Sequence, residues 1–350
     1  MALVGFVPEP NCGRGTVGIL WNCLTTILLC SWTMIHNIDS ESSKHYKIWS
    51  PVRMLLIPEG EACVALLRFV RSWRLRNAVR KHRGWDAFTL RQAFLVYMAG
   101  IRCTPSLELE DLPDLIPRYP NELGNALERF PTDSMIQGRS KSDTIAKAIA
   151  TLQAANFAVT AAFRLGNHAS LSLLEVLTAG YVLCGLIMGL VTLKWPQGFH
   201  EPFQVTLPVP GTTKLEPSAE WRLHRGRQTR TYNASFFDLP MACMTVLFTA
   251  VHLAAWNYPF PSHVEMVAWR VACLVDAVMG LLMLVFFRIN ERRKTLSKRF
   301  GNMGIDVVVV FSYMIARLFI IVESFIAFRA APEEIYQRPS WAAYVGHIGS

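Results

Sequence analysis

The chain has 350 residues, of which 52% are hydrophobic and only 17% are charged, yet its net charge is +9. This composition excludes a disordered chain, which needs low hydrophobicity and a high density of charge. Eight cysteines in 350 residues is an ordinary cysteine density, which excludes a small disulfide-rich protein. Two classes remain: a nucleic-acid binder with a very apolar core, or an integral membrane protein whose cations follow its topology.

The apolar residues gather in blocks that are long enough to cross a bilayer, which takes about 20 residues per helix. Two weaker blocks carry or border charges, and five blocks are stronger. The weaker ones are Pro51–Val70 and Ala146–Phe163, and the stronger ones are Val17–His36, Leu171–Leu193, Leu239–Trp256, Val264–Phe287 and Ile305–Phe328. A soluble all-α bundle is disfavoured, because one soluble core could hardly bury several uncharged segments of this length. The sequence therefore predicts an all-α fold, a polytopic transmembrane helical bundle with six or seven spans.

The basic residues predict the orientation of these spans. Eight cations face one acid in 68–91 and six face one acid in 288–299, and such clusters stay in the cytosol. If Pro51–Val70 crosses the membrane there are seven spans and a cytosolic N-terminus; otherwise there are six and the N-terminus is outside. The predicted order is an N-terminal membrane part (1–70), a cytosolic basic and acidic loop region (71–145), a transmembrane helix pair (146–193), a cytosolic loop (194–238), a three-helix transmembrane region (239–328) and a C-terminal tail (329–350).

The positive charge is thus a topology signal, so we expect the lipid bilayer as a partner and no nucleic acid. Motifs for metal or nucleotide chemistry are missing as well: the cysteines form no C-x-x-C pair, the nine histidines form no H-x-x-x-H set, and no phosphate-binding glycine loop is found. The sequence Glu110-Asp111-x-x-Asp114 has the carboxylate spacing of a magnesium-diphosphate motif. Because Pro113 interrupts it, we interpret it as a solvated acidic loop. We expect no metal and no cofactor.

Ionisable residues inside the predicted spans are the strongest functional signal, because a charge at membrane depth costs about 2.5–3.5 kcal/mol on insertion scales. Asp276 and Arg317 lie in the middle of consecutive antiparallel spans, so they share a depth and could pair, either for structure or for function. Glu59, Glu175 and Glu323 have no obvious cationic partner. A buried carboxyl without a cation stays protonated near neutral pH and is a ready general acid. A structural or interfacial role is the alternative for these residues.

A set of short motifs in roughly residues 5–200 resembles one group of proteins. The motifs are Arg14-Gly15-Thr16, Ile19-Leu20-Trp21-Asn22-Cys23-Leu24-Thr25, Cys30-Ser31-Trp32, His36-Asn37, Pro58-Glu59, Gly84-Trp85, Gln92-Ala93-Phe94, Met98-Ala99-Gly100, Ser140-Lys141-Ser142-Asp143, Leu152-Gln153, Arg164 and Leu174-Glu175-Val176-Leu177-Thr178. Together they resemble fungal polytopic membrane proteins related to the membrane-bound terpene cyclases of ascofuranone and ascochlorin type. The chain departs from that pattern at Asn156-Phe157, where Trp-Phe is expected, and at Lys194-Trp195-Pro196, where Trp-x-Lys-Pro is expected.

The resemblance implies a metal-independent terpene cyclase, of isomerase or lyase type, in the endoplasmic reticulum or another endomembrane. Such an enzyme of fungal secondary metabolism protonates a terminal epoxide on an apolar prenylated substrate and steers the carbocation to a meroterpenoid ring. The candidate catalytic acids are Glu59 and Glu175, which lie in matched segments, and Asp276, which is chosen for its depth alone. Two alternatives stay open: a non-enzymatic accessory or scaffold protein of a biosynthetic cluster, and a small-molecule transporter. The sequence leaves the substrate, the product and the oligomeric state undefined.

Overall fold

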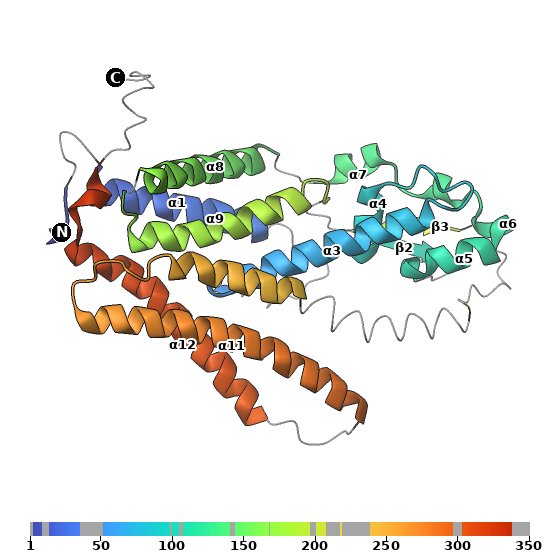
Figure 1. The fold of residues 1–350 in the computed structure, drawn as a ribbon. Helices are drawn as coiled ribbons and strands as arrows, with labels where there is room; N and C mark the ends of the chain where they lie inside the picture. Colours follow the sequence, from blue (N-terminus) through green and yellow to red (C-terminus); the bar gives the residue numbers. More distant parts are fainter. Residues whose placement is uncertain are drawn as a thin grey trace, which may run out of the picture.

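The computed structural model describes residues 3–8, 14–35, 52–98, 100–104, 108–140, 144–167, 169–196, 201–207, 218, 239–296 and 303–337. These residues form a mostly helical fold with two parts, a bundle of long helices and a smaller module at one end of the bundle (Figure 1). The predicted all-α fold class is therefore confirmed, apart from two short two-stranded sheets.

The bundle consists of long helices that run back and forth between its two ends (Figure 1). Their apolar sequences contain few residues that break helices. Within the described part of the chain the helices are α1 (Thr16–Ile35), α8 (Thr144–Gly166), α9 (Leu173–Val191), an unlabelled helix Leu239–Leu253, α11 (His263–Leu296) and α12 (Met303–Ile326). Short connections join α8 to α9 and the helix Leu239–Leu253 to α11.

Three helices of the described residues are long and apolar enough to cross a membrane: Ala148–Gly166, Leu173–Val191 and Val308–Ala330. Two shorter apolar helices, Thr16–Ser31 and Leu239–Leu253, accompany them, and the whole set is smaller than the six or seven spans that were predicted. Large apolar side chains cover the outside of the bundle; Val264, for example, is 76% exposed. An apolar surface of this extent is typical of a face that contacts another apolar phase.

The segment that was predicted as a weak span, Pro51–Val70, is divided in the structure. A short helix at 52–56 ends at Ile57, and α3 (Pro58–Val79) begins with a proline, which is tolerated only in the first turn of a helix. Helix α3 packs on α9 in the bundle and continues into the module, where it contacts α4 and α5 (Figure 1). The predicted boundary between residues 70 and 71 therefore falls inside one continuous helix and is wrong.

The module has a hydrophobic core of its own, which the prediction of a basic and acidic loop region in 71–145 missed. Trp85 packs edge-on against Phe88 and Phe130, with ring centroids 5.8 and 5.3 Å away. Around them lie α4 (Leu90–Tyr97), η1 (Leu109–Asp111), α5 (Leu112–Arg118), α6 (Pro120–Leu123), η2 (Ala126–Arg129) and α7 (Asp133–Arg139).

A parallel strand pair adds part of the predicted loop 194–238 to this module. Strand β2 (Ile101–Thr104) pairs with β3 (Phe203–Thr206), so that Ile101 lies opposite Phe203. Phe203 and Val205 are buried in the same apolar core as Trp85. Residues 101–104 and 203–206, which come from two regions predicted as separate cytosolic loops, therefore belong to one folded unit.

The opposite end of the bundle holds both ends of the described chain (Figure 1). Strand β1 (Leu3–Val4) pairs antiparallel with β4 (Ala331–Pro332), which lies between η3 (Ala327–Ala330) and η4 (Glu333–Tyr336). The predicted tail 329–350 thus starts as packed structure: Ile335 and Tyr336 are buried in the core of the bundle.

Candidate functional site

A cluster of charged side chains lies inside the bundle. It combines Glu59 from the first turn of α3, Asp276 from α11, and Tyr313 and Arg317 from α12. The Glu59, Asp276 and Arg317 residues are 0% exposed. Tyr313 and Arg317 are four residues apart, a spacing that places both side chains on one face of the helix.

Arg317 connects the two carboxyls of this cluster. Its Nη2 donates to Oε1 of Glu59 at 2.6 Å, and the Tyr313 hydroxyl donates to the same carboxylate oxygen. On the other side, Nε of Arg317 lies 3.3 Å from Oδ1 of Asp276, and the hydroxyl of Thr249 donates to Oδ2 of Asp276 at 3.1 Å. The predicted pairing of Asp276 with Arg317 is confirmed. The expectation that Glu59 lacks a cationic partner is wrong, because the guanidinium serves both carboxyls.

Two local features of the sequence build this geometry. Pro58 starts α3 inside the bundle and places Glu59 in its first turn. A carboxylate is favoured there by the helix dipole. Gly280 lets the helix Leu239–Leu253 approach α11 closely, because a Cβ atom at that position would lie 2.6 Å from Cγ2 of Thr245. Gly180 has the same role in α9, where a Cβ atom would lie 2.9 Å from the Phe248 ring.

The charges of the cluster do not balance when both carboxyls are ionised. Glu59 and Asp276 would carry two negative charges against the single positive charge of Arg317. An uncompensated charge in a dry interior is costly, and it is commonly removed by binding a proton. Because Glu59 receives the shorter contacts from Arg317 and from Tyr313, Asp276 is the carboxyl that we expect to hold this proton.

Several polar atoms of the cluster have no hydrogen-bond partner within the described residues. Arg317 Nε and Asp276 Oδ1 face each other as an ion pair without a hydrogen bond. The other four are Glu59 Oε2, Arg317 Nη1, His252 Nε2 and Thr245 Oγ1, and all of them are buried. Buried polar atoms are normally hydrogen-bonded, so an exception asks for an explanation. Four such atoms around one ion-pair cluster give it the capacity to bind a further polar group.

Aromatic rings extend from this cluster toward the end of the bundle opposite the module. Cζ of Arg317 lies 4.2 Å from the ring centroid of Phe248, which is 4.7 Å from the His252 ring. His252 is followed by Trp269 at 6.4 Å, and Trp269 by Phe260 at 5.8 Å. Each aromatic face can stabilise a cation by about 0.5–2 kcal/mol.

Glu175, the second predicted acid, belongs to a different network. Arg14 donates to both of its carboxylate oxygens, one through Nη2 at 2.9 Å, so the expectation that it lacks a cation is wrong. Oε2 also accepts from the backbone and the hydroxyl of Ser172, each at 2.9 Å, in a capping box that starts α9. The Ser-x-x-Glu spacing is the usual sign of such a box and could have identified this role. With these contacts Glu175 fixes a helix end and holds the Arg14 segment.

The other sequence candidates lie outside the cluster. Glu323 is buried, and its Oε1 has no hydrogen-bond partner in the described chain. The acidic motif is not a solvated loop: Asp111 is 3% exposed, and Asp114 accepts hydrogen bonds from the backbone and the hydroxyl of Ser218 at 2.8 and 3.0 Å. Pro113 is tolerated there because it lies in the first turn of α5. Among the described residues, no three His, Cys, Asp or Glu side chains gather to hold a metal ion.

Sequence reasoning missed three members of the buried site: Tyr313, Thr249 and Thr245. Only Tyr313 had a readable signal, because it precedes Arg317 by one helical turn. The others depend on how closely the helix Leu239–Leu253 packs, which the pattern of apolar residues does not reveal.

The chain belongs to a family of unknown function, DUF8562, whose model matches residues 77–212 and 291–348. No curated protein and no solved structure matches the chain. The matched ranges contain the α12 half of the cluster, Tyr313 and Arg317, and the capping residue Glu175. Glu59 and Asp276 lie outside these ranges.

Proposed function

We propose that this member of DUF8562 is an integral membrane enzyme that cyclises a prenylated substrate by protonating its terminal epoxide. The observation that supports this most is the pair of buried carboxyls, Glu59 and Asp276, that shares the single guanidinium of Arg317. A proton bound for electrical neutrality in a dry site is available to a substrate that enters it. The resemblance of the N-terminal motifs to membrane-bound terpene cyclases agrees with this chemistry.

Asp276 is the proposed acid in this reaction. Its carboxyl proton moves to the epoxide oxygen, the C–O bond breaks with its electrons going to oxygen, and a hydroxyl and a carbocation result. A carbon–carbon double bond of the same chain attacks the cation and closes the ring. Loss of a proton from the final cation to the Asp276 carboxylate forms a new double bond and restores the acid.

The remaining residues of the cluster would support the cationic intermediate. Once Asp276 has given up its proton, the cluster carries one net negative charge, which attracts a carbocation. The faces of Phe248 and Trp269 add further stabilisation without reacting as nucleophiles. Arg317 and Tyr313 donate to the Glu59 carboxyl and hold it in place, which leaves Asp276 as the proton donor.

The proposed arrangement in the membrane has six spans, with the basic module in the cytosol and the N-terminus outside. The directions of the helices support it, because α1, α8, α9, Leu239–Leu253, α11 and α12 run alternately toward and away from the module (Figure 1). Helix α3 would enter from the cytosolic side without crossing. We place the protein in the endoplasmic reticulum or another endomembrane.

Cysteine labelling of sealed microsomes tests this topology. Asp86 in the module and Asn167 at the α8–α9 turn are both exposed, at opposite ends of the molecule. In a cysteine-free background, a membrane-impermeant maleimide should label Asp86→Cys in intact microsomes and Asn167→Cys only after permeabilisation. Equal labelling of the two variants in intact microsomes would contradict the proposed topology.

Incubation of microsomes with a prenylated phenol that bears a terminal epoxide tests the reaction. The wild type should form a cyclised product, and Asp276→Asn should form it about 10²–10⁴ times more slowly, the usual contribution of a general acid. Glu323→Gln is the matched control, because it neutralises a buried carboxyl of the bundle outside the cluster. Equal rates for Asp276→Asn and the wild type, at equal protein levels, would exclude Asp276 as the acid.

A transporter is the second candidate, and one observation favours it. The break at Ile57–Pro58 inside the bundle gives a discontinuous helix with a carboxylate at its start, a feature of substrate sites in secondary transporters. In that case Glu59→Gln would abolish uptake of the epoxide into sealed vesicles while no cyclised product forms in any variant. A scaffold protein of a biosynthetic cluster would tolerate both Glu59→Gln and Asp276→Asn.

A further inference from the structure

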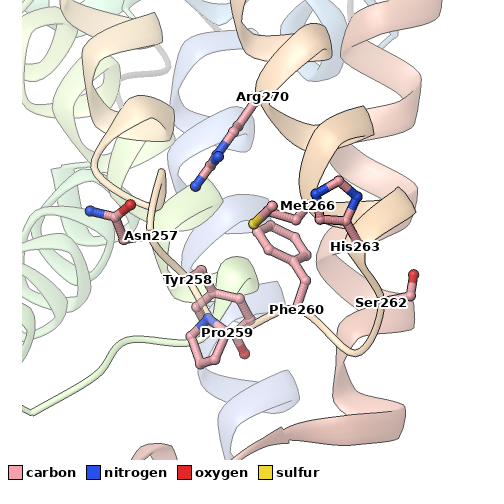
Figure 2. Close-up of a pocket in the computed structure, with 8 residues that line it drawn as sticks. All are labelled: Asn257, Tyr258, Pro259, Phe260, Ser262, His263, Met266 and Arg270. Carbon is pink, nitrogen blue, oxygen red and sulfur yellow. The ribbon is translucent and has the colours of Figure 1, made fainter.

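An open pocket of about 460 Å³ lies between the segment 257–262 and the first turns of α11. It is at the end of the bundle opposite the module (Figure 1). Figure 2 shows the Arg270 side chain reaching from α11 toward the loop that carries Asn257 and Tyr258, with the Met266 sulfur beside the Phe260 ring. The lining residues are Asn257, Tyr258, Pro259, Phe260, Ser262, His263, Met266 and Arg270, and none of them is acidic.

Arg270 is a cation without a carboxylate partner among the described residues. Its Nε donates to the backbone oxygen of Trp256 at 3.0 Å, and its Cζ lies 4.8 Å from the Trp256 ring centroid. Its two Nη nitrogens make no hydrogen bond within the described chain, which leaves up to four N–H donors for a ligand. The nearest acid along α11, Glu265, binds Arg329 and the Ser262 hydroxyl through Oε1, and its Oε2 has no hydrogen-bond partner within the described residues.

Arg270 lies close to the start of α11. Arg270 follows the start of α11 by seven residues, or about 10 Å along the helix axis. It lies within the apolar run Val264–Phe287, just inside the proposed membrane boundary that Trp256 marks. A guanidinium at such a depth normally has a counter-charge, or reaches to the interface. Here the guanidinium reaches Trp256 through Nε and its ring contact, and Arg270 also lines an open pocket without an acidic residue.

We propose that this pocket binds the anionic head of an amphipathic molecule, a phosphate or carboxylate joined to an apolar chain. The Nη nitrogens of Arg270 would bind the anion, since a guanidinium matches both head groups in a bidentate manner. Phe260 and Met266 form an apolar wall for the first part of the chain. The same chemistry is offered by a bilayer phospholipid and by a soluble amphiphile. The proposal does not depend on the cyclase reaction.

Equilibrium binding of dodecyl phosphate to the full-length protein in phosphatidylcholine nanodiscs tests the proposal. The wild type should bind this probe, and Arg270→Gln should bind it at least tenfold more weakly, a loss of 1.4 kcal/mol. Arg270→Lys keeps the charge and should recover part of the affinity. Arg118→Gln removes an exposed arginine of the module and should bind like the wild type. Dodecyl maltoside, a neutral amphiphile of equal chain length, should not compete.

Phosphatidylglycerol in the nanodiscs distinguishes the two sources of the anion. If it weakens the binding of dodecyl phosphate to the wild type but not to Arg270→Gln, the natural occupant is a lipid head group. If it has no effect, the pocket selects a soluble amphiphile. Equal affinity of Arg270→Gln and the wild type, in variants with equal thermal stability, would overturn the proposal. Asp276→Asn should leave probe binding unchanged, so this proposal and the proposed reaction can fail separately.

Discussion

Two buried side chains of the module have backbone partners, whereas the buried carboxyls of the ion-pair cluster in the bundle depend on a charged side chain that is distant in sequence. In the module, the Trp85 indole donates to the backbone oxygen of Leu123 at 2.9 Å, and the Gln92 amide donates to that of Pro131 at 3.0 Å. In the bundle, Glu59 depends on Arg317, which is 258 residues away. The module is thus built like an ordinary soluble core, and the bundle is not.

This difference indicates where function lies. Both side chains of the module named above have a hydrogen-bond partner. Among the described residues, Glu59 Oε2, Arg317 Nη1 and His252 Nε2 of the bundle are buried without one, which costs about 1–3 kcal/mol for a neutral group and more for a charged group. Natural proteins retain such costs mainly at functional sites. The contrast therefore separates a supporting unit from a unit that binds or reacts.

The largest expected effect comes from breaking the ion-pair cluster. Glu59→Gln or Asp276→Asn alone leaves one carboxylate for Arg317, so each single variant should lose no more than about 1 kcal/mol of unfolding free energy. The double variant leaves the guanidinium buried without any counter-charge and should lose about 3–5 kcal/mol. Denaturant unfolding in detergent micelles measures all three variants.

The decisive quantity is the departure from additivity. If the losses of unfolding free energy in the two single variants add up to the loss in the double variant, the carboxyls do not share Arg317 in the way that the structure shows. Restoring neutrality with Arg317→Met in the double variant should recover most of the stability, since an apolar side chain of similar length fits a dry interior.

The sequence was sufficient to predict the helices of the bundle and one ion pair. The apolar blocks follow directly from the length of a membrane span, and Asp276 was matched with Arg317 because consecutive antiparallel spans place their midpoints at one depth. Glu59 could not be matched in the same way. Its helix starts inside the bundle and leaves it, so its depth is set by the break at Pro58 and by packing on α9.

The module was harder to predict, for a different physical reason. Its helices are short, and helices α5 and α6 begin at or next to a proline. The sequence therefore contains no extended helical periodicity of apolar residues there. Its strand pair joins Ile101 to Phe203 across the helices α8 and α9. A contact between segments so far apart leaves no local pattern. The capping box of Thr89 and Gln92 was readable, by contrast, as was that of Ser172 and Glu175.

Close packing of the helix Leu239–Leu253 against its neighbours gives the next prediction. Gly280→Ala would put a methyl group 2.6 Å from Thr245, and overpacking of this kind costs about 1–3 kcal/mol. Because the displaced helix carries Thr249 and His252, the variant should also slow the proposed cyclisation. Gly189→Ala is the matched control, since nothing lies within 4 Å of the added Cβ atom. Equal stability of both variants would mean that the helices are not in this close contact.

The smallest loss of unfolding free energy is expected in the module, where single hydrogen bonds can be removed by substitution. The Thr89 hydroxyl accepts from the backbone of Gln92 at 3.2 Å and donates to Asp133 at 2.7 Å, so it caps α4 and links it to α7. Thr89→Ala should cost about 0.5–2 kcal/mol, and Thr89→Ser, which keeps the hydroxyl, should cost much less. Hydrogen exchange of the α4 amides should become faster in the alanine variant only. If exchange also became faster around Asp276, the two regions would unfold as one unit, and the contrast between a self-sufficient module and a strained bundle would be wrong.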